Sequence, residues 1–61
     1  MSKRITRAGD VVIISETRTD DDYPIIGYFE NDERAEPHNW TSKGEIIKGE
    51  INDDDIVGVY D

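Results

Sequence analysis

Two runs of three aspartates are the residues in this sequence whose type and spacing could do chemistry. They occupy residues 20–22 and 53–55, and each stands before an apolar stretch. Carboxylate oxygens are the ligands that Ca²⁺ and Mg²⁺ prefer, but a dedicated calcium loop spaces its ligands and has a glycine at the sharp turn. Neither run has that pattern. Because Asp side chains also accept hydrogen bonds from nearby backbone amides, we predict that both runs form turns, and we expect no metal and no cofactor.

The other side chains that could take part in catalysis or binding are one histidine and five aromatic residues. His38 could act as a base, but the chain has no cysteine, no obvious nucleophile and too little length to form a deep cleft, so we do not expect an enzyme. Trp40 has the largest apolar surface and is expected to anchor the core. A core of this size does not hold all five aromatic residues, so Tyr23, Tyr28 and Trp40 are possible contacts for a partner.

The net charge of the chain limits the kinds of partner that it can bind. The 61 residues carry a formal net charge of −8, and Lys3, Arg4 and Arg7 are three of the seven basic residues. From residue 8 onward, 4 basic and 15 acidic side chains give 4 − 15 = −11. Such a chain repels nucleic acid and anionic membranes and favours basic partners or simple solubility. The apolar run at residues 11–14 is too short for a signal peptide or a membrane span, so we expect a cytoplasmic protein.

The elements that must position these residues are predicted to be short strands. The apolar runs are rich in β-branched residues and separated by turn residues, and no segment of ten or more residues has a helical apolar period. Gly27 in mid-strand suggests a bulge, and Gly44 is expected to take a positive φ in a tight hairpin. We predict an all-β fold, either a curled five-stranded antiparallel sheet or a partly open SH3-like barrel. Strands are expected at residues 10–16, 23–30, 40–42, 45–49 and 56–60.

The chain is expected to form one small domain with a tail. Residues 1–8 are polar and basic and are predicted to be a flexible N-terminal arm, which leaves residues 9–61 as a single β domain. A domain of this length has a small core, and without disulfides its extra stability would come from assembly with a copy of itself or with a partner.

From Tyr23 onward, about 35 residues follow a pattern of Tyr-Pro, glycine, Trp-Thr, glycine, Gly-Glu and Asp-Ile-Val. This pattern resembles a group of short accessory proteins of bacteriophages and prophages. Ile56 stands where leucine is more usual, and the acidic loop before Trp40 is longer. The resemblance implies a modulator of host machinery that acts in the bacterial cytoplasm, and it implies no enzymatic activity. The matching residues are Tyr23, Pro24, Gly27, Trp40, Thr41, Gly44, Gly49, Glu50, Asp55, Ile56 and Val57.

The prediction for function is therefore a binding protein. Its carboxylates would cover a basic, nucleic-acid-binding surface on a host or phage protein in the manner of a DNA mimic, and would not bind nucleic acid directly. The alternative is a structural protein that forms homo-oligomers or belongs to the virion. The predicted contact residues lie in the two loops that flank the second predicted strand, and they are Asp20, Asp21, Asp22, Glu30, Asp32, Glu33 and Glu36.

Overall fold

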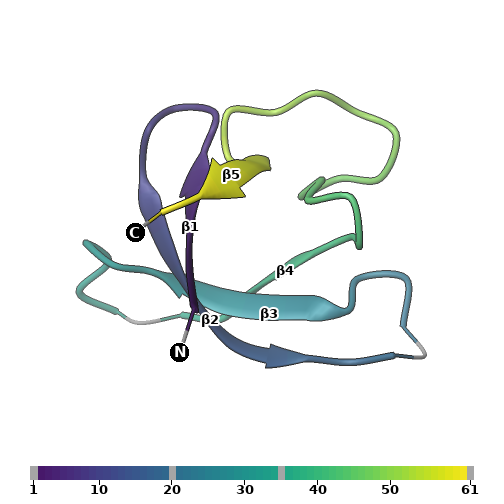
Figure 1. Ribbon diagram of the computed structural model, residues 1–61, viewed down its shortest axis with the longest axis horizontal. Coiled ribbons are helices and arrows are strands. Elements are labelled where there is room, and N and C mark those ends of the chain that lie inside the picture. The colour runs from purple at the N-terminus through teal and green to yellow at the C-terminus, as the bar shows by residue number, and fades with distance from the viewer. Residues whose placement is uncertain (1, 20, 35, 61) are drawn as a thin grey trace.

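The computed structural model describes residues 2–19, 21–34 and 36–60, and this part of the chain forms five strands and no helix. All neighbouring strands are antiparallel, in the order β4-β3-β2-β1-β5, and the sheet curls into a half-barrel (Figure 1). The predicted fold class is confirmed. The strands are β1 (Ser2–Thr6), β2 (Val11–Thr17), β3 (Ile25–Phe29), β4 (His38–Trp40) and β5 (Ile56–Val59).

Strand β1 corrects the prediction of a flexible arm over residues 1–8. β1 lies inside the sheet between β2 and β5, and the amides of Arg7 and Ala8 donate to the carbonyls of Asp55 and Asp53. The domain therefore starts no later than residue 2, and Met1 lies outside the described residues. The apolar pattern does not reveal β1 because Ile5 is its only apolar residue. The strand is held by backbone pairing on both of its sides, which any sequence without proline can supply.

The predicted strands at residues 40–42 and 45–49 are also corrected. β4 begins and ends two residues earlier than predicted, because the hydroxyl of Thr41 accepts a hydrogen bond from the amide of Glu45 at 3.0 Å and starts a turn. Residues 45–49 form turns instead of a strand. Their amides are satisfied by side chains, since the Lys48 amide donates to the Tyr23 hydroxyl and the Gly49 amide donates to the Glu45 carboxylate.

A bulge curls the sheet where the sequence predicts one. The register between β2 and β3 shifts between Ile14 and Glu16, so the extra residue belongs to β2 and lies beside Gly27 of β3. A Cβ atom on Gly27 would lie 2.6 Å from the carbonyl oxygen of Ile13, so only glycine allows the two strands to approach this closely.

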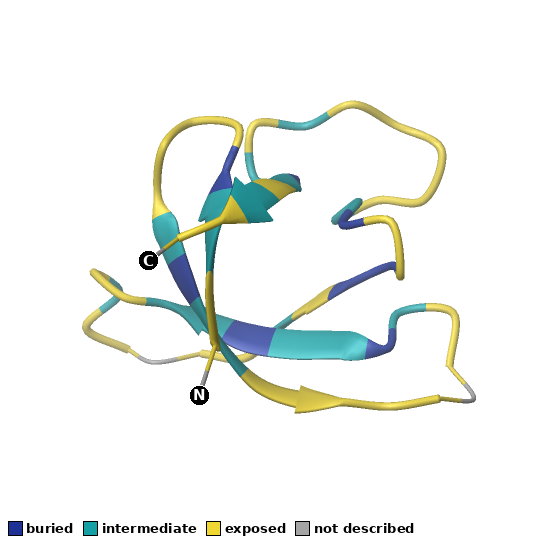
Figure 2. Cartoon of the chain, in the orientation of Figure 1, coloured by how far each residue is buried: buried dark blue, intermediate teal, exposed yellow. Residues whose placement is uncertain are grey.

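The core is built around Trp40, as predicted, and that side chain is not available to a partner. Trp40 and Val12 are fully buried, and the Trp40 indole packs at 5.9 Å from the ring of Phe29. Figure 2 shows buried positions on the inner parts of the sheet and exposed loops around them. Tyr23 and Tyr28 are half-buried, so part of each ring remains accessible.

Two glycines with positive φ provide a matched test of packing against β5. Gly44 has φ +88° and Gly49 has φ +82°, but a Cβ at Gly44 would lie 2.5 Å from the carbonyl oxygen of Ile56, whereas a Cβ at Gly49 would meet nothing within 4 Å. Gly49→Ala should cost about 1–2 kcal/mol from backbone strain alone. Gly44→Ala should lower the free energy of unfolding clearly more than Gly49→Ala does. Urea unfolding followed by circular dichroism measures both values. Equal losses of unfolding free energy in the two variants would show that the close contact between Gly44 and Ile56 adds nothing to the cost of the substitution.

Candidate functional site

The structure does not bring the predicted contact residues together on one surface. Asp21 and Asp22 lie in the connection between β2 and β3, whereas the other described members lie in the connection between β3 and β4, at the opposite end of β3 (Figure 1). The five residues of β3 separate the two loops by roughly 16 Å, at about 3.3 Å per residue. Asp20 lies outside the described residues.

An acidic groove lies at the end of the sheet where β3 runs into its connection with β4. Asp32 lines it together with two aspartates that the sequence prediction missed, Asp10 from the turn after β1 and Asp54 from the loop before β5. The groove is open and has a volume of about 340 Å³. Among the described residues, no lysine or arginine lines it. Its lining residues are Asp10, Val11, Phe29, Asn31, Asp32, His38 and Asp54.

Local hydrogen bonds hold each aspartate of the acidic groove in place. The amide of Asp10 donates to the hydroxyl of buried Thr6 at 3.0 Å. The amide of Asp32 donates to the Phe29 carbonyl at 3.1 Å. The Asp54 carbonyl accepts the indole N–H of Trp40 at 2.8 Å, which ties this loop to the core. Within the described residues, no hydrogen bond reaches the carboxylates of Asp10 and Asp54, so these charges face solvent in the free protein.

One wall of the acidic groove is aromatic. The rings of Phe29 and His38 meet edge to face at 5.0 Å, and His38 also lies 6.1 Å from the ring of Trp40. No group of three or more acidic or histidine side chains within residues 2–19, 21–34 and 36–60 is arranged to hold a metal ion. Carboxylates spread around an aromatic wall instead suit an extended organic cation, which donates charged hydrogen bonds to the carboxylates and stacks on the rings.

The remaining predicted acidic residues are less suited to binding a basic partner. Glu30 is already paired with Lys3 at 2.9 Å, and this hydrogen bond raises the pKa of Lys3. Glu33 and Glu36 are exposed and add negative potential near the acidic groove without lining it. At the other end of β3, a depression of about 220 Å³ mixes carboxylates with ammonium groups, so its net charge is small. It is lined by Asp21, Asp22, Thr41, Ser42, Lys43, Glu45 and Lys48.

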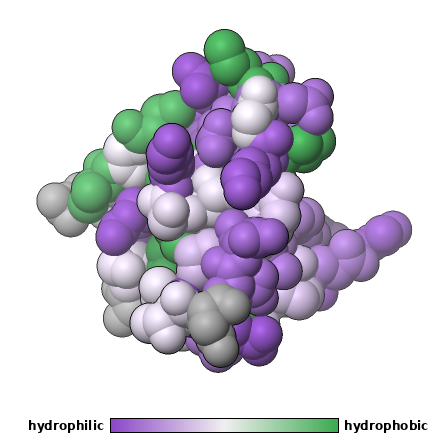
Figure 3. Space-filling model, turned by 90° about the vertical axis from the view of Figure 1, so that its right-hand side faces the viewer, coloured by the Kyte–Doolittle hydropathy of each residue, from purple (hydrophilic) through white to green (hydrophobic). Residues whose placement is uncertain are grey.

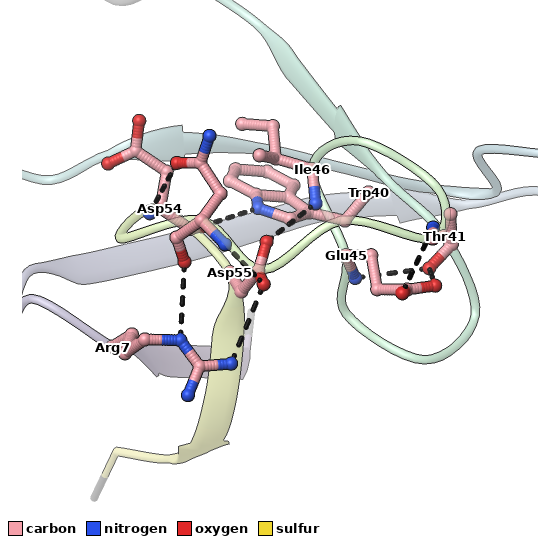
Figure 4. A network of polar contacts seen from close by, with 9 residues as sticks. Arg7, Trp40, Thr41, Glu45, Ile46, Asp54 and Asp55 are labelled. Atoms are coloured by element: carbon pink, nitrogen blue, oxygen red, sulfur yellow. Dashed lines mark hydrogen bonds and ion pairs between the residues drawn. The ribbon is translucent and has the colours of Figure 1, made fainter.

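The described parts of the two aspartate runs, residues 21–22 and 53–55, lie in bends and turns, as predicted, and Asp20 lies outside the described residues. A carboxylate oxygen of Asp21 accepts the amide of Tyr23 at 3.1 Å. Asp55 is only 4% exposed, and its two carboxylate oxygens accept the amides of Ile46 and Asn52, each at 3.0 Å (Figure 4). Its carboxylate also lies 3.5 Å from the guanidinium of Arg7. Asp55 is therefore a structural group that joins the loop before β5 to the turn after β1.

The hydrogen bonds to Asp55 change its acidity. The amides of Ile46 and Asn52, and after them the guanidinium of Arg7, stabilise the ionised carboxylate and hold its pKa below the usual range.

Antiparallel pairing gives the one sequence signal that could have found part of the acidic groove. Val12 lies opposite Phe29, so the residues just before β2 and just after β3 share one end of the sheet. Recognition of the β2–β3 hairpin alone would therefore place Asp10 near Asp32. Asp54 has no such signal, because β5 reaches this region only by pairing with β1.

Comparisons of this chain with protein-family models, with curated proteins and with solved structures found no match. Among the described residues, no helix is long and apolar enough to cross a membrane.

Proposed function

We propose that this chain is a small binding protein that docks its acidic groove onto a basic surface of a host or phage protein. The observation that supports it is one groove that three aspartates from three different loops line beside an aromatic wall, with no lysine or arginine among its described lining residues. The surface that it covers would be one that otherwise holds nucleic-acid phosphates, and the protein would act in the bacterial cytoplasm as a phage accessory protein. We propose no enzymatic activity.

An arginine side chain of the partner fits the acidic groove best. Its guanidinium can donate to carboxylates while its flat face stacks on an aromatic ring. Hydrogen bonds to charged groups contribute about 1.5–3 kcal/mol each where water is excluded. The surrounding negative potential, to which Glu33 and Glu36 contribute, would speed the encounter and make it sensitive to salt.

Neutralising the acidic groove should weaken the binding of an arginine-rich peptide. We expect the triple variant Asp10→Asn, Asp32→Asn, Asp54→Asn to lose about 10- to 100-fold in affinity, if each partly exposed pair contributes about 0.5–1 kcal/mol. Asparagine keeps the shape and the oxygen of each side chain, so the loops should stay folded. Isothermal titration calorimetry with a six-arginine peptide measures the effect. Binding should also weaken strongly between about 50 and about 500 mM salt.

A matched control separates the acidic groove from net charge. The triple variant Asp21→Asn, Asp22→Asn, Glu50→Gln removes the same charge from exposed positions that do not line the acidic groove. It should bind the peptide nearly as well as the unmodified protein. Equal losses in the two triple variants, or an affinity that does not respond to salt, would contradict the proposal. A pull-down from a bacterial lysate with both variants would then identify the natural partner.

A further inference from the structure

The free edge of β5 exposes large apolar side chains. β5 is the last strand of the sheet and pairs only with β1. Val57, Val59 and Tyr60 are 53%, 64% and 44% exposed, and they make up three of the five exposed large hydrophobic residues among those described. Figure 3 shows one face of the molecule, which is mostly hydrophilic and has hydrophobic residues at the top and along both upper sides.

The backbone of β5 has unused pairing capacity. The Tyr60 amide donates to the Lys3 carbonyl, and Val59 lies opposite Arg4. Because antiparallel pairs alternate, the N–H and C=O groups of Val59 point away from β1, toward the free side. The start of the strand is covered, since the Ile56 amide donates to the Gly44 carbonyl. An uncovered edge without lysine or proline is a template for another strand. The other edge, β4, has only three residues.

A groove beside β5 has a charge opposite to that of the chain as a whole. Its volume is about 310 Å³, and Arg4 and Lys43 are the only charged residues among its described lining residues, although the whole chain carries −8. An apolar strand that carries carboxylates would suit it. It is lined by Arg4, Ile25, Ser42, Lys43, Gly44, Ile56, Val57, Gly58 and Val59.

We propose that the occupant is β5 of a second copy of this chain, paired antiparallel across a two-fold axis near Val59. β5 has the required chemistry, since an exposed aspartate, Asp53, lies shortly before its apolar residues. Antiparallel pairing at this position places the exposed Val59 side chains of the two copies beside each other, next to Arg4 of β1, which lies opposite Val59. The patch is therefore complementary to itself, as a two-fold interface requires. This dimer uses the β5 edge and leaves the acidic groove open.

The oligomeric state of the intact chain tests the proposal. Sedimentation equilibrium from about 10 µM to about 1 mM should show the mass rising from the 7.0 kDa of the chain toward twice that value. Val59→Glu, at an exposed position, should raise the dimer dissociation constant at least about tenfold without unfolding the monomer. Ile51→Glu is the matched control, because Ile51 is 85% exposed and does not line the β5 groove. It should leave the dissociation constant unchanged.

Hydrogen exchange gives a second readout that depends on backbone pairing. The Val59 amide should become more protected as the protein concentration rises, and this gain should vanish in Val59→Glu. A mass that stays at that of one chain up to about 1 mM would overturn the proposal, even if a synthetic apolar-acidic strand peptide binds the edge. Continued growth beyond two chains would also overturn it, because a two-fold interface closes. So would equal effects of the two glutamate variants.

Discussion

Trp40→Ala is expected to unfold the protein at room temperature. Trp40 is fully buried and packs against Phe29 and His38, and truncation of a buried tryptophan costs about 3–5 kcal/mol. A domain of this size is held by no more than about 3–5 kcal/mol in total. The variant also leaves the Asp54 carbonyl without its indole donor, so the loop before β5 loses its tie to the core.

Urea unfolding followed by circular dichroism measures the loss, and two variants locate its cause. Trp40→Phe keeps an aromatic ring but removes the indole N–H, so it should stay folded and lose about 1–3 kcal/mol. Tyr60→Ala removes a ring that is already 44% exposed and should cost much less than Trp40→Ala. The role given to Trp40 would be wrong if Trp40→Ala unfolded at the same urea concentration as the unmodified protein.

Loss of the charge on Asp55 should also have a large effect, and that effect should depend on pH. The native pKa of Asp55 is lowered, first by the amides of Ile46 and Asn52 and then by Arg7. The unfolded chain therefore binds this proton at a higher pH than the folded chain does. The stabilisation is present above the unfolded pKa of about 3.9 and is lost as the pH falls through the lower native value. The protein should accordingly weaken below about pH 4.

Asp55→Asn should lower the melting temperature at pH 7 by about 5–10 °C, as expected when a small domain loses one or two buried hydrogen bonds. The amide side chain keeps one acceptor oxygen for the two backbone amides and no longer attracts Arg7. The variant should also lose part of the decline in stability between about pH 4 and about pH 2. Thermal unfolding at a series of pH values gives both results.

Asp53→Asn is the control for Asp55, because Asp53 belongs to the same run but is exposed. It should leave the melting temperature and its pH dependence nearly unchanged. If both variants shifted the pH profile equally, the effect would come from net charge and not from the hydrogen bonds of Asp55. The two positions therefore separate a structural carboxylate from a surface one within three residues of sequence.

The sequence by itself determined the features that depend on neighbouring residues. The predicted strands at residues 10–16, 23–30 and 56–60 correspond to β2, β3 and β5, because β-branched runs between turn residues favour extended backbone. The positive φ at Gly44 and the turn at residues 53–55 are equally local. The expectation that Trp40 is buried follows from its size alone.

Only the tertiary structure decided the features that depend on residues far apart in the chain. β1 is polar and basic, and it becomes a strand because β2 and β5 supply backbone partners on both of its sides. The turn in place of a strand at residues 45–49 depends on Tyr23 and Asp55, whose side chains accept its amides. Neither β1 nor the turn at residues 45–49 has a local apolar pattern that would predict it.

The candidate site was likewise predicted in part from the sequence and in part decided only by the tertiary structure. Composition predicted an acidic binding surface, and Asp32 belonged to the predicted set. The acidic groove also needs Asp10 and Asp54, and these meet Asp32 only because the sheet curls and β5 pairs with β1. The sequence determines which residues carry charge, because charge is a property of each side chain. The fold decides which charges share a surface, because that depends on the pairing of distant strands.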